Sequence, residues 1–522
     1  MNDIVYYSQF GAKGDGVADD YEAIKAAHEY ANSNGYKVCA DEGKTYRIGI
    51  VTDPIIVKTE TDWCGATIVF DDSVIRWDNP LRSGWIFRVR SSQPDNDVEI
   101  TVPEGYSLSK GQTNIGMTFD KPCMLKIFND NEKIYLRYGP NQNNGVPVHE
   151  MIIVDEQGNV DPSTPVQYDY PAVTSIVRYS IDDTPLCIGN GTLVTFAPNP
   201  REQDPDYENN YCYYYRGVLI ERSNTTFHNI NYVVENEDLT IPIDRNGDGV
   251  IDIYHEDKSY GVPYHGTLNF QNCYNVAFTD STVEGHQAYS FWQGEKLNIR
   301  NEMGSYAINA TYGIGLSFTN VTQYENHETG ETITNRQMYH GIMGSNFCRN
   351  FTVDNCYFDR FDSHQGLYNA TLTNSTFGFG ILVIGGGTLY IENVKRIALG
   401  EFVHLRTDYN SVFDGDVIIK NCEMGEEVKH IFFGRWISHF NGLPNRVNRT
   451  LTIDGLTVKG NALSIFNIYG ATEDALTDEV NPLYLPERIT VSRVYGADGV
   501  TEITPALSAR DDAFARLSYD YK

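Results

Sequence analysis

The stretch FGAKGDGVADDYEAIKAAHEYANSNG, residues 10–35 of the 522-residue chain, decides the fold. It opens with a Gly-rich turn that follows a short strand. Asp19 can then cap a helix while Glu22 bonds back to it, which is the arrangement of a capping box. The apolar residues from Ala23 to Ala31 recur at helical spacing, and Asn34-Gly35 is a typical helix end. The segment therefore predicts a strand, a tight turn and one amphipathic helix.

The same segment resembles the N-terminal signature of the pectate-lyase superfamily, which reads strand, FGAxGDGxxDD and then a helix ending in Asn-Gly. In this chain the match covers about residues 4–50. The family includes polygalacturonase-like hydrolases and many phage tailspikes, and its helix plugs the open N-terminal end of a right-handed parallel β-helix. The resemblance therefore implies an all-β solenoid of this kind with an N-terminal capping helix.

From Tyr215 onward, short apolar strands end in Asn, Asp, Ser or Thr at spacings of 19 to 40 residues, the range of solenoid turns. Asn and Asp suit the corners because they tolerate left-handed backbone. Two segments, beginning at Tyr264-His265-Gly266 and Tyr339-His340-Gly341, match at an offset of 75 residues, which we interpret as three turns of about 25 residues. The predicted corners include Asp280-Ser281, Asn320-Val321, Asn355-Cys356, Asn374-Ser375, Asn393-Val394, Asn421-Cys422 and Asp454-Gly455.

The whole chain, residues 1–522, is predicted to be a single β-helix domain with its cap at 1–50. Residues 95–215 differ from the rest, because their apolar runs are broken by Pro, Asn, Gly and Asp clusters; they predict a mostly antiparallel insertion. The main run of turns is expected over 216–480. Residues 481–522 are expected to form a C-terminal cover, since a solenoid must protect its open end.

Composition narrows the partners. Lys and Arg total 40 against 70 Asp and Glu, for a formal charge of −30. This balance argues against nucleic acid, whose phosphates need a basic surface, and against anionic membranes. Thirty-six tyrosines supply flat rings with hydroxyls, which suit sugars. We therefore expect a carbohydrate polymer or oligosaccharide as the partner, with no nucleic acid and no membrane.

The cysteines and the first residues bear on the compartment. Nine cysteines are scattered without CxxC spacing, which indicates neither a disulfide framework nor a zinc site. Met1 to Asp3 lead directly into a predicted strand, so no signal peptide is expected in these first residues. The expected location is secreted or cell-surface if a signal was removed, and otherwise cytoplasmic or a phage tail.

The first candidate site is residues 359–366, DRFDSHQG, directly after a predicted corner. Glycosidic hydrolysis needs two carboxyl groups that flank the bond. We predict Asp359 and Asp362 as the catalytic pair, and the 75-residue repeat places Glu284 level with Asp359 as a further catalytic carboxylate. The alternative is a solvated turn whose acids cap backbone N–H groups. Substrate-binding residues predicted around this site are Arg360, His364 and His286.

The second candidate site is the strand 401–409. Strand alternation puts Val403 and Leu405 on one face. His404, Arg406 and Asp408 fall on the other face, where they form a predicted sugar-binding ladder; the alternative is a surface ion pair of little energetic value. Further substrate-binding candidates, one turn on, are Arg435 and Trp436, although Trp436 is also consistent with packing.

A calcium loop is predicted at DRNGDGVID, residues 244–252, which matches the first nine positions of an EF-hand loop. His255 stands at position twelve, where a bidentate acid belongs. The predicted calcium would have a structural role, and no cofactor is expected for catalysis. The alternative to a calcium site is an acidic Gly turn. The predicted ligands are Asp244, Asn246, Asp248, Val250 and Asp252.

The superfamily's better-known active-site motifs are missing, since Asn-Thr-Asp, Gly-His-Gly and Arg-Ile-Lys do not occur. No catalytic residue is therefore carried over from the resemblance. P-loop, HExxH and GxSxG motifs are absent too. The leading hypothesis is a glycoside hydrolase that acts in a groove along the β-helix. The alternatives are a polysaccharide lyase acting on a uronic-acid polymer, and a non-catalytic glycan-binding adhesin or tailspike-like protein. The chain is expected to be a monomer or a homotrimer.

Overall fold

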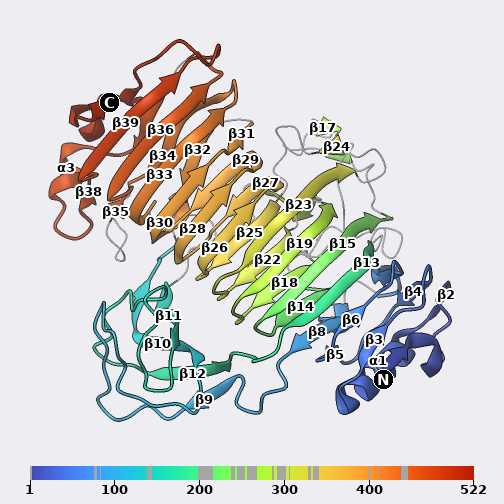
Figure 1. Cartoon of the computed structure of the whole chain (residues 1–522). Coiled ribbons are helices and arrows are strands. Elements are labelled where there is room, and N and C mark those ends of the chain that lie inside the picture. The colour runs from blue at the N-terminus through green and yellow to red at the C-terminus, as the bar shows by residue number, and fades with distance from the viewer. Residues whose placement is uncertain are drawn as a thin grey trace.

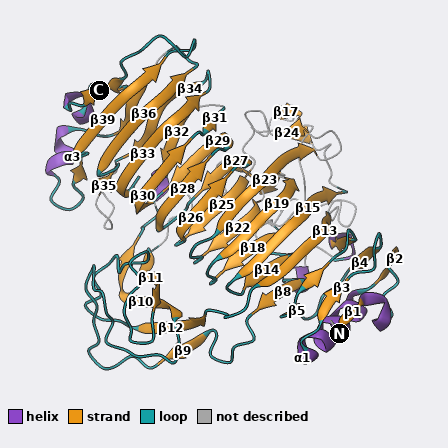
Figure 2. Ribbon diagram, in the orientation of Figure 1, coloured by secondary structure: helices purple, strands orange, loops and turns teal. Residues whose placement is uncertain are grey.

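The computed structural model describes most of the chain. The described residues are 3–75, 79–82, 84–137, 144–197, 215–236, 242–243, 253–254, 267–284, 287–290, 301–304, 306–326, 331–332, 340–397, 400–409, 411–436, 445–461 and 463–521. Within them, no helix is both long and apolar enough to cross a bilayer. Figure 2 shows strands as nearly all of the regular structure, with helices chiefly near the two ends of the chain.

The N-terminal segment forms β1 (Ile4–Tyr6), β2 (Asp15–Asp19), α1 (Tyr21–Asn34) and β3 (Lys37–Cys39). The buried Asp20 holds the Gly-rich turn, because its carboxylate accepts the N–H groups of Lys13 and Gly14 at 2.6 and 3.1 Å. Asp20, rather than Asp19, occupies the N-cap position, and its side chain makes no capping bond to the helix. Gly35 ends the helix at a φ of 71°. Figure 1 shows α1 at the N-terminal end of the stacked strands; its role as a cap stays a prediction.

The rest of the main sheet consists of parallel strands stacked turn upon turn, which we call the coil (Figure 1). Two of its faces matter for the site. The first face comprises β13 (Leu186–Phe196), β15 (Thr225–Glu235), β19 (Val276–Glu284), β23 (Ser317–Asn326), β26 (Arg349–Asp354), β28 (Leu367–Thr373), β30 (Gly385–Glu392), β33 (Phe413–Met424), β36 (Thr450–Val458) and β39 (Arg488–Tyr495). Each strand of this face pairs in parallel with the next.

The second face is built in the same way from strands of the neighbouring side of each turn. Its strands are β5 (Ile55–Val57), β8 (Phe87–Arg90), β14 (Val218–Glu221), β18 (Leu268–Gln271), β22 (Tyr306–Thr311), β25 (His340–Asn346), β27 (Tyr357–Asp362), β29 (Thr376–Val383), β32 (Gly400–Leu405), β34 (Val428–Arg435), β37 (Ser464–Tyr469) and β40 (Ala506–Ser508). Shorter elements include β4 (Thr45–Ile48), β6 (Thr61–Asp62), β7 (Thr67–Asp71), β31 (Lys395–Arg396), α3 (Glu473–Thr477), β38 (Leu483–Tyr484) and β41 (Asp520–Tyr521).

The predicted corners are confirmed. Asp280, Asn320 and Asn355 have φ values of 52°, 56° and 51°, in the left-handed region that Asn and Asp tolerate. Their side chains form a ladder: Asn355 donates to Asn320 at 2.7 Å, and Asn320 donates to Asp280 at 2.8 Å. The ladder satisfies polar groups that each corner would otherwise leave to water.

The 75-residue repeat spans two turns of the coil, and the predicted three turns are wrong. Phe278 pairs with Phe318 and Phe318 pairs with Val353, so the two turns hold 40 and 35 residues. Loops between the strands lengthen each turn, and the spacing of matching residues does not reveal how that length is divided.

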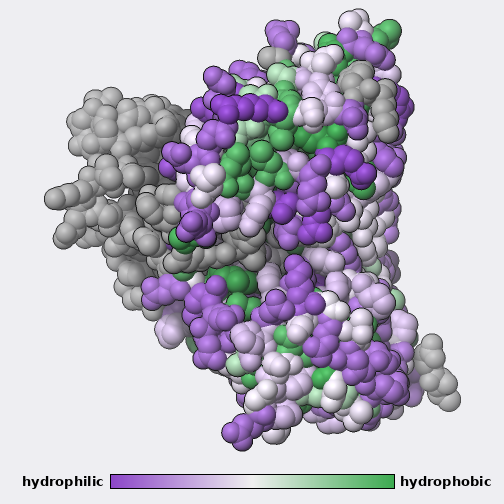
Figure 3. All heavy atoms as spheres, turned by 90° about the vertical axis from the view of Figure 1, so that its left-hand side faces the viewer, coloured by the Kyte–Doolittle hydropathy of each residue, from purple (hydrophilic) through white to green (hydrophobic). Residues whose placement is uncertain are grey.

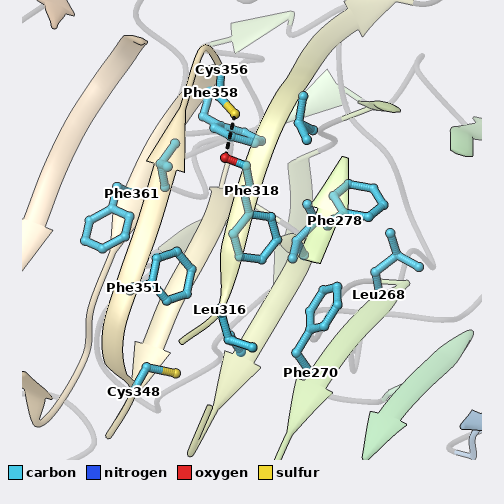
Figure 4. Close-up of a cluster of buried hydrophobic side chains, with 14 of the residues drawn as sticks. Leu268, Phe270, Phe278, Leu316, Phe318, Cys348, Phe351, Cys356, Phe358 and Phe361 are labelled. Atoms are coloured by element: carbon cyan, nitrogen blue, oxygen red, sulfur yellow. Dashed lines mark hydrogen bonds between the residues drawn. The ribbon is translucent and has the colours of Figure 1, made fainter. Parts of the chain in front are cut away.

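The core runs along the inside of the coil (Figure 4). Phe318 and Phe351 stack with ring centroids 5.1 Å apart, and Phe270 meets Phe318 edge-on at 5.5 Å. Cys356, one corner further along, donates its thiol to the Phe318 carbonyl at 3.4 Å. Burying each such ring contributes roughly 1.5–3 kcal/mol, so the stack stabilises every turn it crosses. The eight described cysteines are free thiols.

A separate antiparallel sheet lies beside the coil, in the order β11-β10-β12-β9 (Figure 1). Its strands are β9 (Val98–Ile100), β10 (Cys123–Ile134), β11 (Val146–Val154) and β12 (Ser175–Ser180). It is narrower than the predicted insertion of 95–215, because β13 within that range pairs in parallel in the coil. Arg349 of the coil and Glu150 of β11 form a buried ion pair between the two parts, and Arg349 also donates to the Pro165 carbonyl at 2.8 Å.

The coil continues into the region predicted as a C-terminal cover. β39 pairs in parallel with β36, and β40 pairs in parallel with β37. Phe514, fully buried, then packs against Phe466 with ring centroids 4.6 Å apart. Apolar packing therefore reaches close to the last described residue.

Candidate functional site

The predicted carboxylates Asp359 and Asp362 lie in strand β27 rather than in a loop. Both are buried, at 1% and 0% exposure. The backbone N–H of Asp359 donates to Gln323 Oε1 at 2.9 Å. Neither side chain therefore faces open solvent, because the two stand within the packed flank of the second face.

Asp362 is the centre of a buried ion cluster. Arg406 Nη1 lies 2.8 and 3.0 Å from its two oxygens, Arg360 bonds to one of them, and His364 Nδ1 lies 3.6 Å away. Burial opposes ionisation of Asp362, but the two guanidinium groups and His364 hold its pKa well below its usual range. Four of the predicted site residues thus meet, and the arrangement keeps this carboxyl ionised. A proton donor needs the opposite, so Asp362 is suited to fixing the arginines.

Glu284 lies two turns of the coil before Asp359 and pairs with Tyr324 of the turn between them. Its side chain is buried on β19 and accepts the backbone N–H of Val234 at 2.7 Å. His286, the side chain of Asp408 and the predicted calcium ligands of 244–252 lie outside the described residues. Among the residues that the structure describes, no group of three or more His, Cys, Asp and Glu side chains is placed to hold a metal ion.

His404 lies half-buried on the second face. Its Nδ1 bonds to Glu401 at 2.5 Å, and its ring lies 5.0 Å from that of Phe433. Val403 and Leu405 point into the core, as predicted. One turn further, Trp436 Nε1 donates to the Asn481 carbonyl at 3.0 Å, which favours its alternative, packed role. Arg435, which pairs with Tyr469, is exposed.

A pocket of about 510 Å³ lies where the antiparallel sheet meets the first face. Loops of the antiparallel sheet form one wall, and the strands β28, β30 and β33, with Arg449 just before β36, form the other. Figure 3 views this side of the molecule, where hydrophilic side chains predominate around smaller apolar areas. The lining residues are Lys110, Gly111, Tyr135, Pro165, Val166, Gln167, Tyr168, Leu367, Tyr368, Asn369, Gly385, Gly386, Gly387, Thr388, Asp414, Gly415, Asp416 and Arg449.

Glycines leave part of the coil wall of the pocket without side chains. Gly387 has a φ of +78°, and a Cβ there would lie 2.4 Å from Asn369 Oδ1. A Cβ on Gly415, in the next turn, would lie 2.0 Å from the Gly387 carbonyl oxygen. No larger residue fits either position without backbone movement, so the close approach of neighbouring turns requires glycine at both.

Two carboxylates stand at this wall. Asp414 and Asp416 are alternate residues of β33, so their side chains lie on one face of the strand. Asp414 pairs with Arg446 at 3.2 Å and with Arg449 at 3.1 Å. Asp416 accepts the Thr450 hydroxyl at 2.7 Å. One acid therefore lies between cations, and its neighbour bonds to a neutral group.

Tyrosines form the opposite and adjoining walls. Burial raises the pKa of Tyr135 well above its usual value, and the nearby Tyr168 and Asp414 raise it further. Burial likewise raises the pKa of Tyr168 to about 12. Both phenols are therefore neutral hydrogen-bonding groups near neutral pH. Tyr368 adds a third ring, with the Arg349 guanidinium 5.4 Å from its centroid.

Asp414 and Asp416 are not among the site residues predicted from the sequence. The available signal was the run Phe413–Val417, FDGDV, in which two acids alternate around a glycine, one turn after the glycines 385–387. A strand that alternates acid and glycine exposes both carboxylates on one side. What could not be seen is that the loops of residues 110 and 165–168 lie opposite them.

Comparison with family models and with curated protein sequences gives no match for this chain. Solved structures do match. The tailspike protein gp49 from Pseudomonas phage LKA1 is 12% identical, and the alignment covers 98% of this chain and 83% of that one with a TM-score of 0.53. This chain is a right-handed parallel β-helix. The right-handed parallel β-helix implied by the N-terminal signature is thereby confirmed.

Two further solved structures match with lower TM-scores. The surface adhesin PfbA of Streptococcus pneumoniae is 13% identical over 92% of this chain and 93% of its own, with a TM-score of 0.43. The endo-xylogalacturonan hydrolase from Aspergillus tubingensis is 10% identical over 94% of this chain and 95% of its own, with a TM-score of 0.35. At such identities the likeness concerns the fold, and the function must be argued from the site.

Proposed function

We propose that this β-helix binds a carbohydrate chain in the pocket between the antiparallel sheet and the first face, and hydrolyses a glycosidic bond there. The observation that carries the proposal is the pair Asp414 and Asp416, set on one face of β33 at the wall of a tyrosine-lined pocket. Paired carboxylates are the minimum that most glycoside hydrolases require. Neutral phenols and flat rings supply the hydrogen bonds and stacking that sugars use.

The two acids have different surroundings, which suits different roles. Alternate residues of a strand have Cα atoms about 6.6 Å apart, within reach of one bond between two sugars. Asp414 lies between Arg446 and Arg449 and is the better candidate for the base or nucleophile. Asp416, which bonds to the Thr450 hydroxyl, is the better candidate for the acid that protonates the leaving oxygen.

A polysaccharide lyase is the second candidate, and one observation favours it. The pocket is lined by three tyrosines, Tyr135, Tyr168 and Tyr368, together with the cations Lys110 and Arg449. A lyase needs a base that removes the proton next to a uronate and a cation that neutralises its carboxylate. The products distinguish the two reactions, because elimination leaves an unsaturated sugar that absorbs ultraviolet light and hydrolysis does not.

The tailspike likeness bears on the remaining alternative, a glycan-binding protein without catalysis. A secreted, cell-surface or phage-tail location agrees with this likeness. A non-catalytic tailspike-like protein would be a homotrimer that retains its glycan unchanged, whereas a hydrolase would release reducing ends as a monomer or a trimer. Sedimentation of the purified protein measures which assembly forms.

The deciding experiment is a screen of the purified full chain against a glycan library, read by reducing ends, ultraviolet absorbance and retained ligand. With a cleaved glycan in hand, Asp414→Asn and Asp416→Asn should each lower kcat by at least about 100-fold. Asp454→Asn is the matched control, because Asp454 also pairs with an arginine, Arg493, but lies outside the pocket. Full activity in both pocket variants would show that hydrolysis does not occur at this pair.

A further inference from the structure

A serine, a histidine and a glutamate stand side by side on three neighbouring strands of the second face. Glu401 of β32 pairs with His430 of β34, and His430 pairs with Ser464 of β37. Ser464 Oγ lies 2.7 Å from His430 Nδ1, closer than its other acceptor, the Phe466 carbonyl at 3.3 Å. Adjacent strands of a sheet are about 4.8 Å apart, so the register alone brings the three groups within reach.

Each group has the surroundings that a nucleophile and its base require. Burial lowers the pKa of His430; Glu401 raises it, and Lys429 and Arg510 lower it, with a net downward shift. His430 is therefore a neutral imidazole near neutral pH, able to accept the serine proton. Glu401 is itself held by His404, which bonds to Glu401 Oε1. Arg510, which stacks on Tyr469 at 3.6 Å and bonds to Asn467, brings a fixed positive charge to the same surface.

We propose that Ser464 and His430 form a nucleophile–base pair that hydrolyses O-acyl esters, with Glu401 as the positioning residue of His430. The site lies on the second face, apart from the pocket on the first face, and does not depend on the glycosidic reaction proposed there. Because the chain has no GxSxG motif, the pair is invisible in the sequence: its members lie 34 residues apart, and only the stacking of turns brings them together.

The reaction balances without any cofactor. Ser464 Oγ attacks the ester carbonyl carbon while His430 Nδ1 takes the hydroxyl proton. The bond from the acyl carbon to the alcohol oxygen breaks, and the leaving oxygen takes the proton from His430. Water then attacks the acyl-serine by the same route, which releases the carboxylic acid and restores the serine. Ser464 is nearly buried, so the acyl group must be small, as acetyl is.

The first test uses the unaltered protein. A fluorophosphonate probe with a short alkyl chain, which reacts only with activated serines, should label the full chain once, and peptide mass spectrometry should place the label on Ser464. The protein should also release p-nitrophenol from p-nitrophenyl acetate, and release it more slowly from the octanoate because the site is narrow. No label, or a label elsewhere, would overturn the proposal.

Variants then separate catalysis from folding. Ser464→Ala should abolish labelling, and His430→Gln should slow it at least about 100-fold. Ser492→Ala is the matched control, since Ser492 is another strand serine with a hydrogen-bonded side chain, remote from this site. Ser464→Cys keeps a nucleophile of similar size and should still release p-nitrophenol, which shows that loss in the alanine variant is not misfolding.

The role of Glu401 has its own readout. Glu401 raises the pKa of His430, so Glu401→Gln should move the acid limb of the rate–pH profile to lower pH, along with lowering the rate. A merely structural role would lower the rate without moving the limb. A Ser464→Ala variant that hydrolyses p-nitrophenyl acetate at the unaltered rate would refute the whole assignment.

Discussion

Arg406 reaches across two turns of the coil to Asp362, with its Nη1 2.8 Å from Asp362 Oδ1. In the register, Asp362 pairs with Leu382 of the next turn and Leu382 with His404 of the turn after that. The ion pair therefore ties β27 to β32 across the intervening strand. The sequence predicted Asp362 as a catalytic carboxylate and Arg406 as a sugar-binding residue, and the burial of both makes stability their clearest measurable contribution.

Asp362→Asn should destabilise the protein by about 3–5 kcal/mol, because it leaves buried arginines without their charge partner. Asp454→Asn, at an exposed pair with Arg493, should cost at most about 1 kcal/mol. Urea unfolding followed by circular dichroism measures both. Equal urea midpoints for the two variants would contradict the conclusion that Asp362 neutralises buried arginines. If Asp359→Asn and Asp362→Asn both keep full carbohydrate cleavage, the predicted catalytic role of this strand is also wrong.

The same carboxylate gives a pH dependence. Its pKa in the folded protein is well below the unfolded value, so its contribution to stability is fully present above the unfolded pKa of about 3.9. It is lost as the pH falls towards the folded pKa. The difference in Tm between the unaltered protein and Asp362→Asn should therefore be constant from pH 7 to 5 and shrink below pH 4. A difference that grows on acidification would reverse the assigned sign.

The buried pair of Arg349 and Glu150 should control docking of the antiparallel sheet. Arg349→Ala leaves Glu150 as an uncompensated buried charge, a loss of about 3–5 kcal/mol that acts between the sheet and the coil. Amide hydrogen exchange should rise in residues 98–180 and stay low in β30 and β33. The double variant Arg349→Met with Glu150→Gln removes both charges and should recover most of the protection. Uniform exchange over the whole chain would mean that the pair stabilises the coil instead.

Gly387→Ala should narrow the pocket at its coil wall. The new Cβ meets Asn369 Oδ1, and the left-handed backbone disfavours any side chain, so stability should fall by roughly 1–3 kcal/mol. Glycan binding should weaken by more than the loss of stability explains, because the substitution moves the wall of the pocket toward the proposed ligand. Gly499→Ala is the control: it has a similar φ but no atom near the new Cβ. Equal effects on binding would place the ligand elsewhere.

The calcium loop at 244–252 remains a prediction from its ligand spacing. If it binds calcium, a free concentration of 100 times the Kd adds about 2.7 kcal/mol of stability, and Tm rises accordingly. Asp248→Asn should remove most of that rise. The control Asp498→Asn, at an acidic residue outside the loop 244–252, should not. No change in Tm between saturating calcium and chelator would favour the acidic Gly turn.

The repeated turns of the chain could be predicted from the sequence alone. The stretch 10–35 indicated the N-terminal segment, and the Asn and Asp corners marked each turn, because left-handed φ values leave few choices of residue. The number of turns within the 75-residue repeat was predicted wrongly, since loop length between strands carries no periodic signal.

Which side chains meet depends on the tertiary structure. Asp362 and Arg406, Asp414 and Tyr168, and Ser464 and His430 come from different turns or from the antiparallel sheet. The residues that become neighbours in the coil depend on the strand register and on how far each loop extends. Neither can be predicted from the local sequence pattern. The alternation of residues on a strand predicted that His404 faces away from the core. Burial, which depends on what lies over each strand, determines whether such a residue is exposed to solvent.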